Sequence, residues 1–184
     1  MIQKSTTLHS LHITGGYGCT APLSHPSVRH LSVIYPSHLN SSLVYSLEDV
    51  RMPRLRGLSI EAWDPKALMQ LKLIDTPVSS LRLACHGLYG GVDDLITELW
   101  VDATVPLLRS VPRLEEVELL AEPKLMAKVI EALGKEPSLC AELRAFTVGV
   151  FAERLGEEGA ASSEELKVAA AAVVAQRLQG LSTQ

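Results

Sequence analysis

Aromatic residues make up only 4% of this sequence, although 47% of its residues are hydrophobic. That composition indicates a core built from stacked aliphatic side chains. No hydrophobic run approaches the ~18 residues that a membrane-spanning helix needs, and the first ten residues offer no apolar signal segment. We therefore expect neither a membrane partner nor an export signal.

Cysteine is also scarce. Cys19, Cys85 and Cys140 are widely spaced and form no C-x-x-C pair, which argues against a disulfide framework and against a zinc site. We expect free thiols in a reducing compartment, the cytosol or the nucleus.

The charged residues lack a basic cluster. Residues 1–92 contain eight Lys and Arg against five Asp and Glu (+3), whereas residues 93–184 contain nine against sixteen (−7). Nucleic-acid binding needs basic side chains gathered on one face, so we expect no nucleic-acid partner.

A short unit organises the chain. In residues 52–63, MPRLRGLSIEAW, Pro53 precedes the apolar pattern Leu55-x-x-Leu58-x-Ile60. The pattern occurs seven times, beginning at Leu8, Val28, Leu55, Val78, Ile96, Leu114 and Leu143. Intervals of 18 to 29 residues between copies are typical of repeat proteins whose units stack into a solenoid.

Each copy predicts a short strand, because alternating apolar residues point to the same face. The fifth copy is ambiguous: GGVDDLITELWV, residues 90–101, also fits the start of a helix, so residues 92–102 are open between strand and helix. Three of the segments between copies have apolar residues at helical spacing and predict helices. The first has Leu39, Leu43 and Leu47, and the second has Ala67, Leu68, Leu71 and Ile74 after the capping pair Asp64-Pro65. The third has Leu125, Val129, Ile130 and Leu133 and is followed by Gly134 and Pro137.

Strand, turn and helix in alternation predict a parallel sheet with helices on its other side. We expect residues 1–151 to form an α/β solenoid of six to seven irregular repeats, a horseshoe with the sheet on the concave side and helices on the convex side. Residues 152–184 predict a linker and an alanine-rich helix that begins at the capping box Ser162-x-x-Glu165. The sequence leaves open whether this helix caps the last repeat, is loosely attached or binds a partner.

The repeated units resemble leucine-rich repeats over roughly residues 8–151. The proline before the strand and the phrases MPRLRGLSI and VPRLEEVELL are similar to the repeat regions of F-box proteins, especially the fungal ones. The resemblance implies that the repeats hold substrates for a cullin-type ubiquitin ligase, while a separate F-box docks on the ligase adaptor. No F-box is visible before Leu8, so we expect a fragment or a divergent member, with the adaptor as a partner only if an F-box lies outside this chain.

The sequence departs from the leucine-rich-repeat pattern after each strand. The asparagine that commonly stands there is replaced by Gly16, Pro36, Trp63, His86, Thr104, Glu122 and Phe151. We therefore expect no continuous ladder of polar side chains at this edge.

Residues that alternate with the inward aliphatics should face solvent on the concave side. Early strands place small polar and histidine residues there, such as His12, His30 and Ser59, and later ones place carboxylates. We predict a recognition patch for a basic peptide or protein surface, formed by Arg82, Glu98, Trp100, Asp102, Glu116 and Glu118. The alternative is that the carboxylates are merely solvated and that Trp100 belongs to the core if its segment is helical.

No set of residues predicts catalysis. Gly15-Gly16-Tyr17-Gly18 lacks the Lys-Ser/Thr pair of a phosphate-binding loop and predicts a flexible turn. His9 and His12 fall on opposite faces of a strand, and Cys85-His86 has no evident third partner.

We therefore expect a protein-interaction module without a cofactor, and not an enzyme. Its family-implied function is substrate recognition in an F-box-type ubiquitin ligase. The alternatives are a stand-alone repeat scaffold or inhibitor, and a hydrolase that uses Cys85 and His86.

Overall fold

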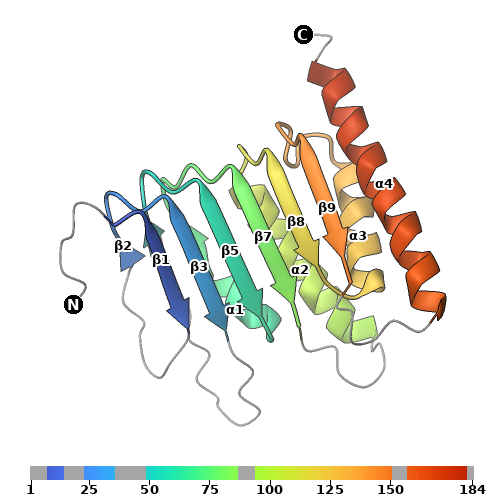
Figure 1. Cartoon of the computed structure of the whole chain (residues 1–184), viewed down its shortest axis with the longest axis horizontal. Coiled ribbons are helices and arrows are strands. Elements are labelled where there is room, and N and C mark those ends of the chain that lie inside the picture. The colour runs from blue at the N-terminus through green and yellow to red at the C-terminus, as the bar shows by residue number, and fades with distance from the viewer. Residues whose placement is uncertain (1–7, 15–22, 36–48, 87–93, 151–156, 182–184) are drawn as a thin grey trace.

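The computed structural model describes residues 8–14, 23–35, 49–86, 94–150 and 157–181. Its main feature is a six-stranded sheet in which every strand runs parallel to its neighbours and the strands follow one another in chain order (Figure 1). The strands are β1 (Ser10–Thr14), β3 (His30–Tyr35), β5 (Gly57–Ala62), β7 (Ser80–Cys85), β8 (Glu116–Leu120) and β9 (Ala145–Gly149). The predicted α/β class with a parallel sheet is confirmed.

The repeated apolar pattern explains why these strands form. Six of its seven copies lie on them, and the register aligns equivalent residues of successive copies side by side. Two buried rows result, each residue at most 5% exposed: Leu31, Leu58, Leu81 and Val117, then Val33, Ile60, Leu83 and Leu119. Each strand thus buries its aliphatic side chains against those of the strands beside it.

Three very short strands form a second parallel sheet, which the sequence did not predict. They are β2 (Leu23–Ser24), β4 (Asp49–Arg51) and β6 (Lys72–Leu73), in that order. Strands of two or three residues are too short to show a period of two, so no pattern in the sequence announces them.

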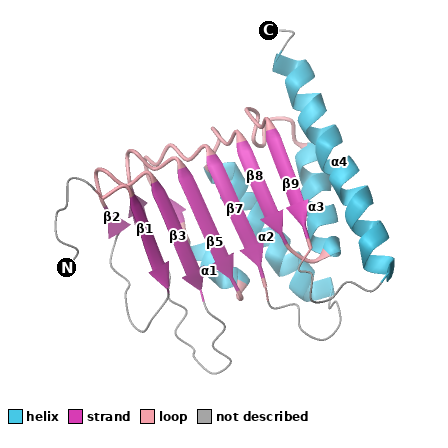
Figure 2. Ribbon diagram, in the orientation of Figure 1, coloured by secondary structure: helices cyan, strands magenta, loops and turns pink. Residues whose placement is uncertain are grey.

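The described residues also form four helices, and Figure 2 shows α1, α2 and α3 behind one face of the main sheet. They are α1 (Pro65–Gln70), α2 (Asp94–Ser110), α3 (Pro123–Lys135) and α4 (Glu157–Leu181). Each helix contacts the next one along the chain. The other face of the main sheet carries the alternate side chains of the strands.

The predicted start of α1 is confirmed. The Asp64 side chain accepts a hydrogen bond of 2.9 Å from the backbone N–H of Lys66, and Pro65 occupies the first turn. The predicted stripe runs on to Ile74, but the helix ends at Gln70. It ends there because the following residues, Lys72 and Leu73, pair with β4 instead.

The fifth copy of the pattern does not form a strand; that prediction is wrong. Residues 96–101 lie inside α2, and Trp100, Thr104 and Leu107 face the core with the spacing of a helix. Trp100 is only 1% exposed. Burial of its large ring on a helix outweighs the short strand pattern, and this is the alternative that the sequence left open.

The third predicted helix is confirmed, since α3 buries Leu125, Val129, Ile130 and Leu133. It ends at Lys135, immediately after Gly134. Ion pairs join it to α2, from Lys124 to Asp94 and from Lys128 to Glu98. Arg109 of α2 also pairs with Glu136, the residue after α3, at 2.7 Å.

The C-terminal helix α4 begins at Glu157, so Ser162 lies inside the helix and the predicted capping box does not start it. The helix packs against α3 and β9 (Figure 1). On this helix Leu166, Ala170 and Val173 are buried, whereas Leu178 is 45% exposed. Of the three arrangements left open by the sequence, the structure has the helix packed against the last strand.

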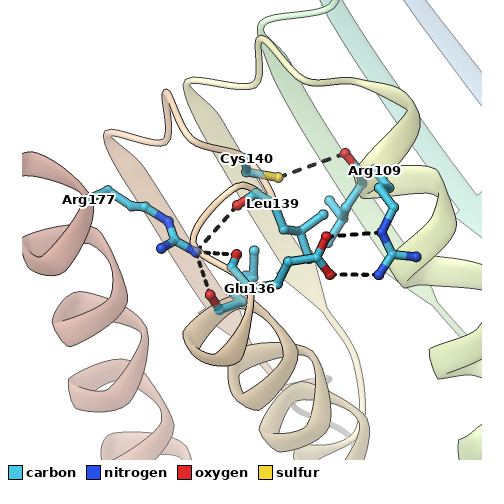
Figure 3. A network of polar contacts seen from close by, with 7 residues as sticks. Arg109, Glu136, Leu139, Cys140 and Arg177 are labelled. Carbon is cyan, nitrogen blue, oxygen red and sulfur yellow. Dashed lines mark hydrogen bonds and ion pairs between the residues drawn. The ribbon is translucent and has the colours of Figure 1, made fainter. Parts of the chain in front are cut away.

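A buried arginine holds α4 in place. The Arg177 guanidinium, 5% exposed, donates from Nη2 to the backbone oxygens of Leu133, Glu136 (3.0 Å) and Leu139 (3.4 Å) (Figure 3). The Leu133 and Glu136 carbonyls lie at the C-terminal end of α3, where the helix itself supplies no donors, and Leu139 lies in the turn that follows. Arg177 therefore caps α3 from a neighbouring helix.

Some predictions fall outside the described residues, namely the stripe of Leu39, Leu43 and Leu47 and the turn at residues 15–18. Within the described part of the chain, no helix is long and apolar enough to cross a membrane.

Candidate functional site: the open face of the sheet

The face of the main sheet that points away from α1, α2 and α3, called here the open face, carries three rows of side chains. The register sets each row across six strands. The rows are Ser10, His30, Gly57, Ser80, Glu116 and Ala145; His12, Ser32, Ser59, Arg82, Glu118 and Thr147; and Thr14, Ile34, Glu61, Ala84, Leu120 and Gly149. Apart from Ala84, these residues are exposed or half-buried.

Polar contacts link residues of the middle row to their neighbours on the open face. His12 Nδ1 lies 3.0 Å from Ser32 Oγ, and the other imidazole nitrogen lies 3.4 Å from Thr14 Oγ1. Further along, Arg82 Nε lies 3.1 Å from Glu118 Oε2, with the two side chains 56% and 41% exposed. Such an exposed ion pair contributes little to stability, on the order of 0–1 kcal/mol.

The open face is hollowed over β1 to β7. The hollow has a volume of about 340 Å³, and its polar lining includes His12, His30, Ser32, Ser59, Ser80 and Arg82. No carboxylate is among the described residues that line it. This part of the face therefore offers hydroxyl, imidazole and guanidinium groups, all of which can donate hydrogen bonds.

Gly57 gives His30 its place in the hollow. A Cβ atom on Gly57 would lie 2.6 Å from His30 Nδ1, far inside van der Waals contact. Because the two residues are register partners on β5 and β3, the glycine leaves room for the imidazole to lie over its backbone.

The predicted recognition patch is divided by the structure. Arg82, Glu116 and Glu118 do lie together on the open face, on the adjacent strands β7 and β8. Two carboxylates of β8 thus border the hollow at its Arg82 end.

Glu98, Trp100 and Asp102 are not on the open face, because their segment is the helix α2. Trp100 is buried in the core, and Glu98 pairs with Lys128 of α3. Asp102 is exposed on the same helix. The patch was predicted from a strand at residues 96–101, and that part is wrong. Three of its six members, Arg82, Glu116 and Glu118, remain on the open face.

A second polar cluster lies where β5 and β7 end. The rings of Trp63 and His86 stack with centroids 4.1 Å apart and planes 7° from parallel. Glu61 Oε1 lies 3.2 Å from His86 Nε2. Burial lowers the pKa of His86 below its ordinary value, and the Glu61 carboxylate opposes that shift. An aromatic stack thus occupies two positions where the usual leucine-rich repeat has asparagine.

Cys85 is not placed for nucleophilic chemistry. Its side chain is 1% exposed in the core, and burial raises the pKa of the thiol well above its ordinary value. A thiolate is the nucleophilic form, so this cysteine stays inert at neutral pH. The hydrolase alternative therefore loses its proposed nucleophile.

Metal ligands are not gathered in the described residues, where no group of three or more His, Cys, Asp and Glu side chains is arranged to hold an ion. Comparison of the chain with protein families, with curated proteins and with solved structures yields no match.

Sequence reasoning identified the open-face positions but not the hollow. His12, His30 and Ser59 fall on this face by simple alternation along the strands. The signal for the hollow that was missed is the cross-strand pairing of Gly57 with His30. This pairing can be seen once the third copy of the apolar pattern is aligned with the second.

Proposed function

We propose that this chain is a protein-binding module of the leucine-rich-repeat type, a solenoid whose open face is the concave docking surface. One observation carries the proposal: six parallel strands in chain order present three registered rows of accessible, mostly polar side chains. A face of that kind offers many independent contact positions on a rigid support, as extended repeat surfaces do. Burial of Cys85 in the core removes the nucleophile of the hydrolase alternative, which favours binding.

We extend the proposal to substrate recognition in an F-box-type ubiquitin ligase. Support for this step comes from the resemblance of MPRLRGLSI and VPRLEEVELL to the repeats of such receptors. In this arrangement the open face holds the substrate, and an F-box outside these repeats contacts the ligase adaptor. A stand-alone scaffold or inhibitor uses the same face without the ligase.

The binding face is tested by blocking its centre. Ser59→Trp places a large ring in the hollow, and Ser138→Trp adds the same ring to an exposed turn after α3 as a matched control. Photo-crosslinking residues at the same two positions identify partners in cells of the source organism, and calorimetry with the purified partner gives its affinity. We expect Ser59→Trp to weaken binding at least about tenfold and Ser138→Trp to leave it unchanged; equal binding by both variants refutes the docking surface.

The ligase role is tested separately, on the fate of that partner. For a substrate receptor, Ser59→Trp lengthens the half-life of the partner in cells and reduces its ubiquitin conjugates. A partner that binds the open face but keeps the same half-life and conjugation contradicts the ligase role and supports the scaffold.

A further inference from the structure

The open face is divided by charge between β7 and β8. The hollow over β1 to β7 is lined by hydroxyls, imidazoles and the guanidinium of Arg82. The next strand presents two carboxylates, Glu116 and Glu118, which are two residues apart and therefore on the same face. A donor-rich hollow thus stands beside an acidic strand.

The donor groups of the hollow retain capacity for a ligand. The side chains of Ser59 and Ser80 make no hydrogen bond to any described residue. Arg82 uses Nε for Glu118, which leaves the donors on its two terminal nitrogens. Because the Arg82–Glu118 pair is exposed, a ligand can compete for the guanidinium at little cost.

We infer that the hollow takes an acidic side chain of the docked protein, an Asp or Glu carboxylate, and that a Lys or Arg of the same segment lies against Glu116 and Glu118. This inference rests on the proposed function. Arg82 is the one permanently charged group among the described residues that line the hollow, so it matches the single charge of a carboxylate. Guanidinium and carboxylate also fit each other in a bidentate geometry, and the serine hydroxyls can bind the remaining lone pairs.

The spacing of the strands sets the spacing of the two partner residues. A carboxylate held between Ser59 of β5 and Arg82 of β7 lies about one and a half strand spacings from Glu118 on β8. Neighbouring strands are about 4.8 Å apart, so the two sites are about 7 Å apart along the face. An extended segment that crosses the strands advances about 3.3 Å per residue and points every second side chain to the same face, which puts its basic residue two positions from its acidic one.

The test uses a short acetylated peptide amide with one glutamate and, two positions on, one lysine. Variants replace the glutamate by glutamine or phosphoserine, or the lysine by norleucine, and a further peptide reverses the order of the two charges. Binding to the full chain is followed by NMR, from the ring signals of His12 and His30. We expect saturable shifts with one order of the glutamate and lysine, and at least about tenfold weaker binding when glutamine replaces the glutamate.

Arg82→Ala is the decisive protein variant, and Arg109→Ala is its control. Arg109 of α2 pairs with Glu136, the residue after α3, with side chains 54% and 39% exposed, so both variants remove an Arg–Glu pair of similar exposure. We expect Arg82→Ala to weaken peptide binding about tenfold or more, and Arg109→Ala to leave it unchanged. Glu118→Gln should remove the preference for lysine over norleucine while the glutamate is still bound.

The outcomes separate this inference from the proposed function. If Ser59→Trp abolishes binding of the protein partner but Arg82→Ala and the glutamine peptide bind as tightly as their parents, the open face is a docking surface and the carboxylate site is refuted. Tighter binding of the phosphoserine peptide than of the glutamate peptide also refutes the carboxylate assignment. If Ser59→Trp leaves partner binding intact, the proposed function itself fails.

Discussion

Replacing Arg177 by methionine tests how α4 is held to the rest of the fold. Methionine keeps most of the length and the apolar stem of the side chain but removes the guanidinium. In the native chain Nη2 donates to the backbone oxygens of Leu133, Glu136 and Leu139. The variant leaves these carbonyls, at the end of α3 and in the turn after it, without that donor.

The magnitude follows from the contacts. A hydrogen bond from a charged donor contributes about 1.5–3 kcal/mol, and Nη2 carries two hydrogens, so about two of the three contacts act at full strength. Two opposing costs reduce the sum: the guanidinium is almost fully buried, and its Nε has no hydrogen-bond partner among the described residues. We therefore expect Arg177→Met to lower the free energy of unfolding by about 2–3 kcal/mol.

The assay is urea unfolding followed by circular dichroism, with thermal unfolding as a second measure. A loss of this size lowers Tm by roughly 4–12 °C in a chain of this length. Lys167→Met is the control on the same helix, because its pair with Glu164 is exposed; we expect it to change stability by less than about 0.5 kcal/mol. Hydrogen exchange should accelerate in α4 before β5. If Arg177→Met matches the control, the guanidinium network does not hold α4.

Three further predictions concern the core and its titrating groups. Trp100→Ala should destabilise the fold by about 3–5 kcal/mol, seen as a fall of about 6 °C or more in Tm, while an open-face ligand still binds, because the ring is buried on α2. Burial lowers the pKa of His86 in the folded chain, so the unfolded chain binds a proton on this residue more readily. The contribution of His86 to the free energy of unfolding is therefore complete above about pH 6.5 and is lost as the pH falls below that value. Urea unfolding at pH 7.5 and 5.5 should show this loss for the native chain but not for His86→Gln. Burial also raises the pKa of the Cys140 thiol to about 11 and that of the Cys85 thiol further. Mass mapping after a short alkylation at pH 8 should therefore find both thiols unmodified until denaturant is added. Rapid labelling in the native state would contradict their burial.

The sequence predicted the main sheet because its signal is local and repeated. Each strand carries two apolar residues of one short pattern, and the pattern recurs every 18 to 29 residues along the chain. It predicted α3 for a similar reason, since Leu125, Val129 and Leu133 have clear helical spacing.

The fifth copy misled the prediction because one segment satisfied two periods. Ile96, Leu99 and Val101 match the strand pattern, but the helix buries Thr97, Trp100 and Thr104, two of which are threonines. A pattern read from large aliphatics alone gives threonine no weight, although it is small enough to pack inside. The error moved half of the predicted binding patch to the wrong side of the sheet.

The hollow and the α4 contact depend on tertiary structure that no local pattern encodes. The fit of His30 over Gly57 requires the register between two strands 27 residues apart in the chain. The contact of Arg177 with Leu133 joins residues 44 positions apart, and a lone arginine in an alanine-rich segment reads as a solvated charge.

Sequential strand order has a consequence for how the fold comes apart. Each strand of the main sheet pairs only with the strands of the neighbouring units, so the described structure can be lost one unit at a time from an end. At the β9 end, α4 packs against the last strand, and Arg177 ties α4 to the end of α3. At the β1 end, Leu11 and Ile13 are only half-buried, whereas their register partners Leu31 and Val33 are fully buried. Fraying should therefore begin at β1 and take His12 and its side of the hollow first, so that ligand affinity decays before the β8 and β9 end of the sheet opens.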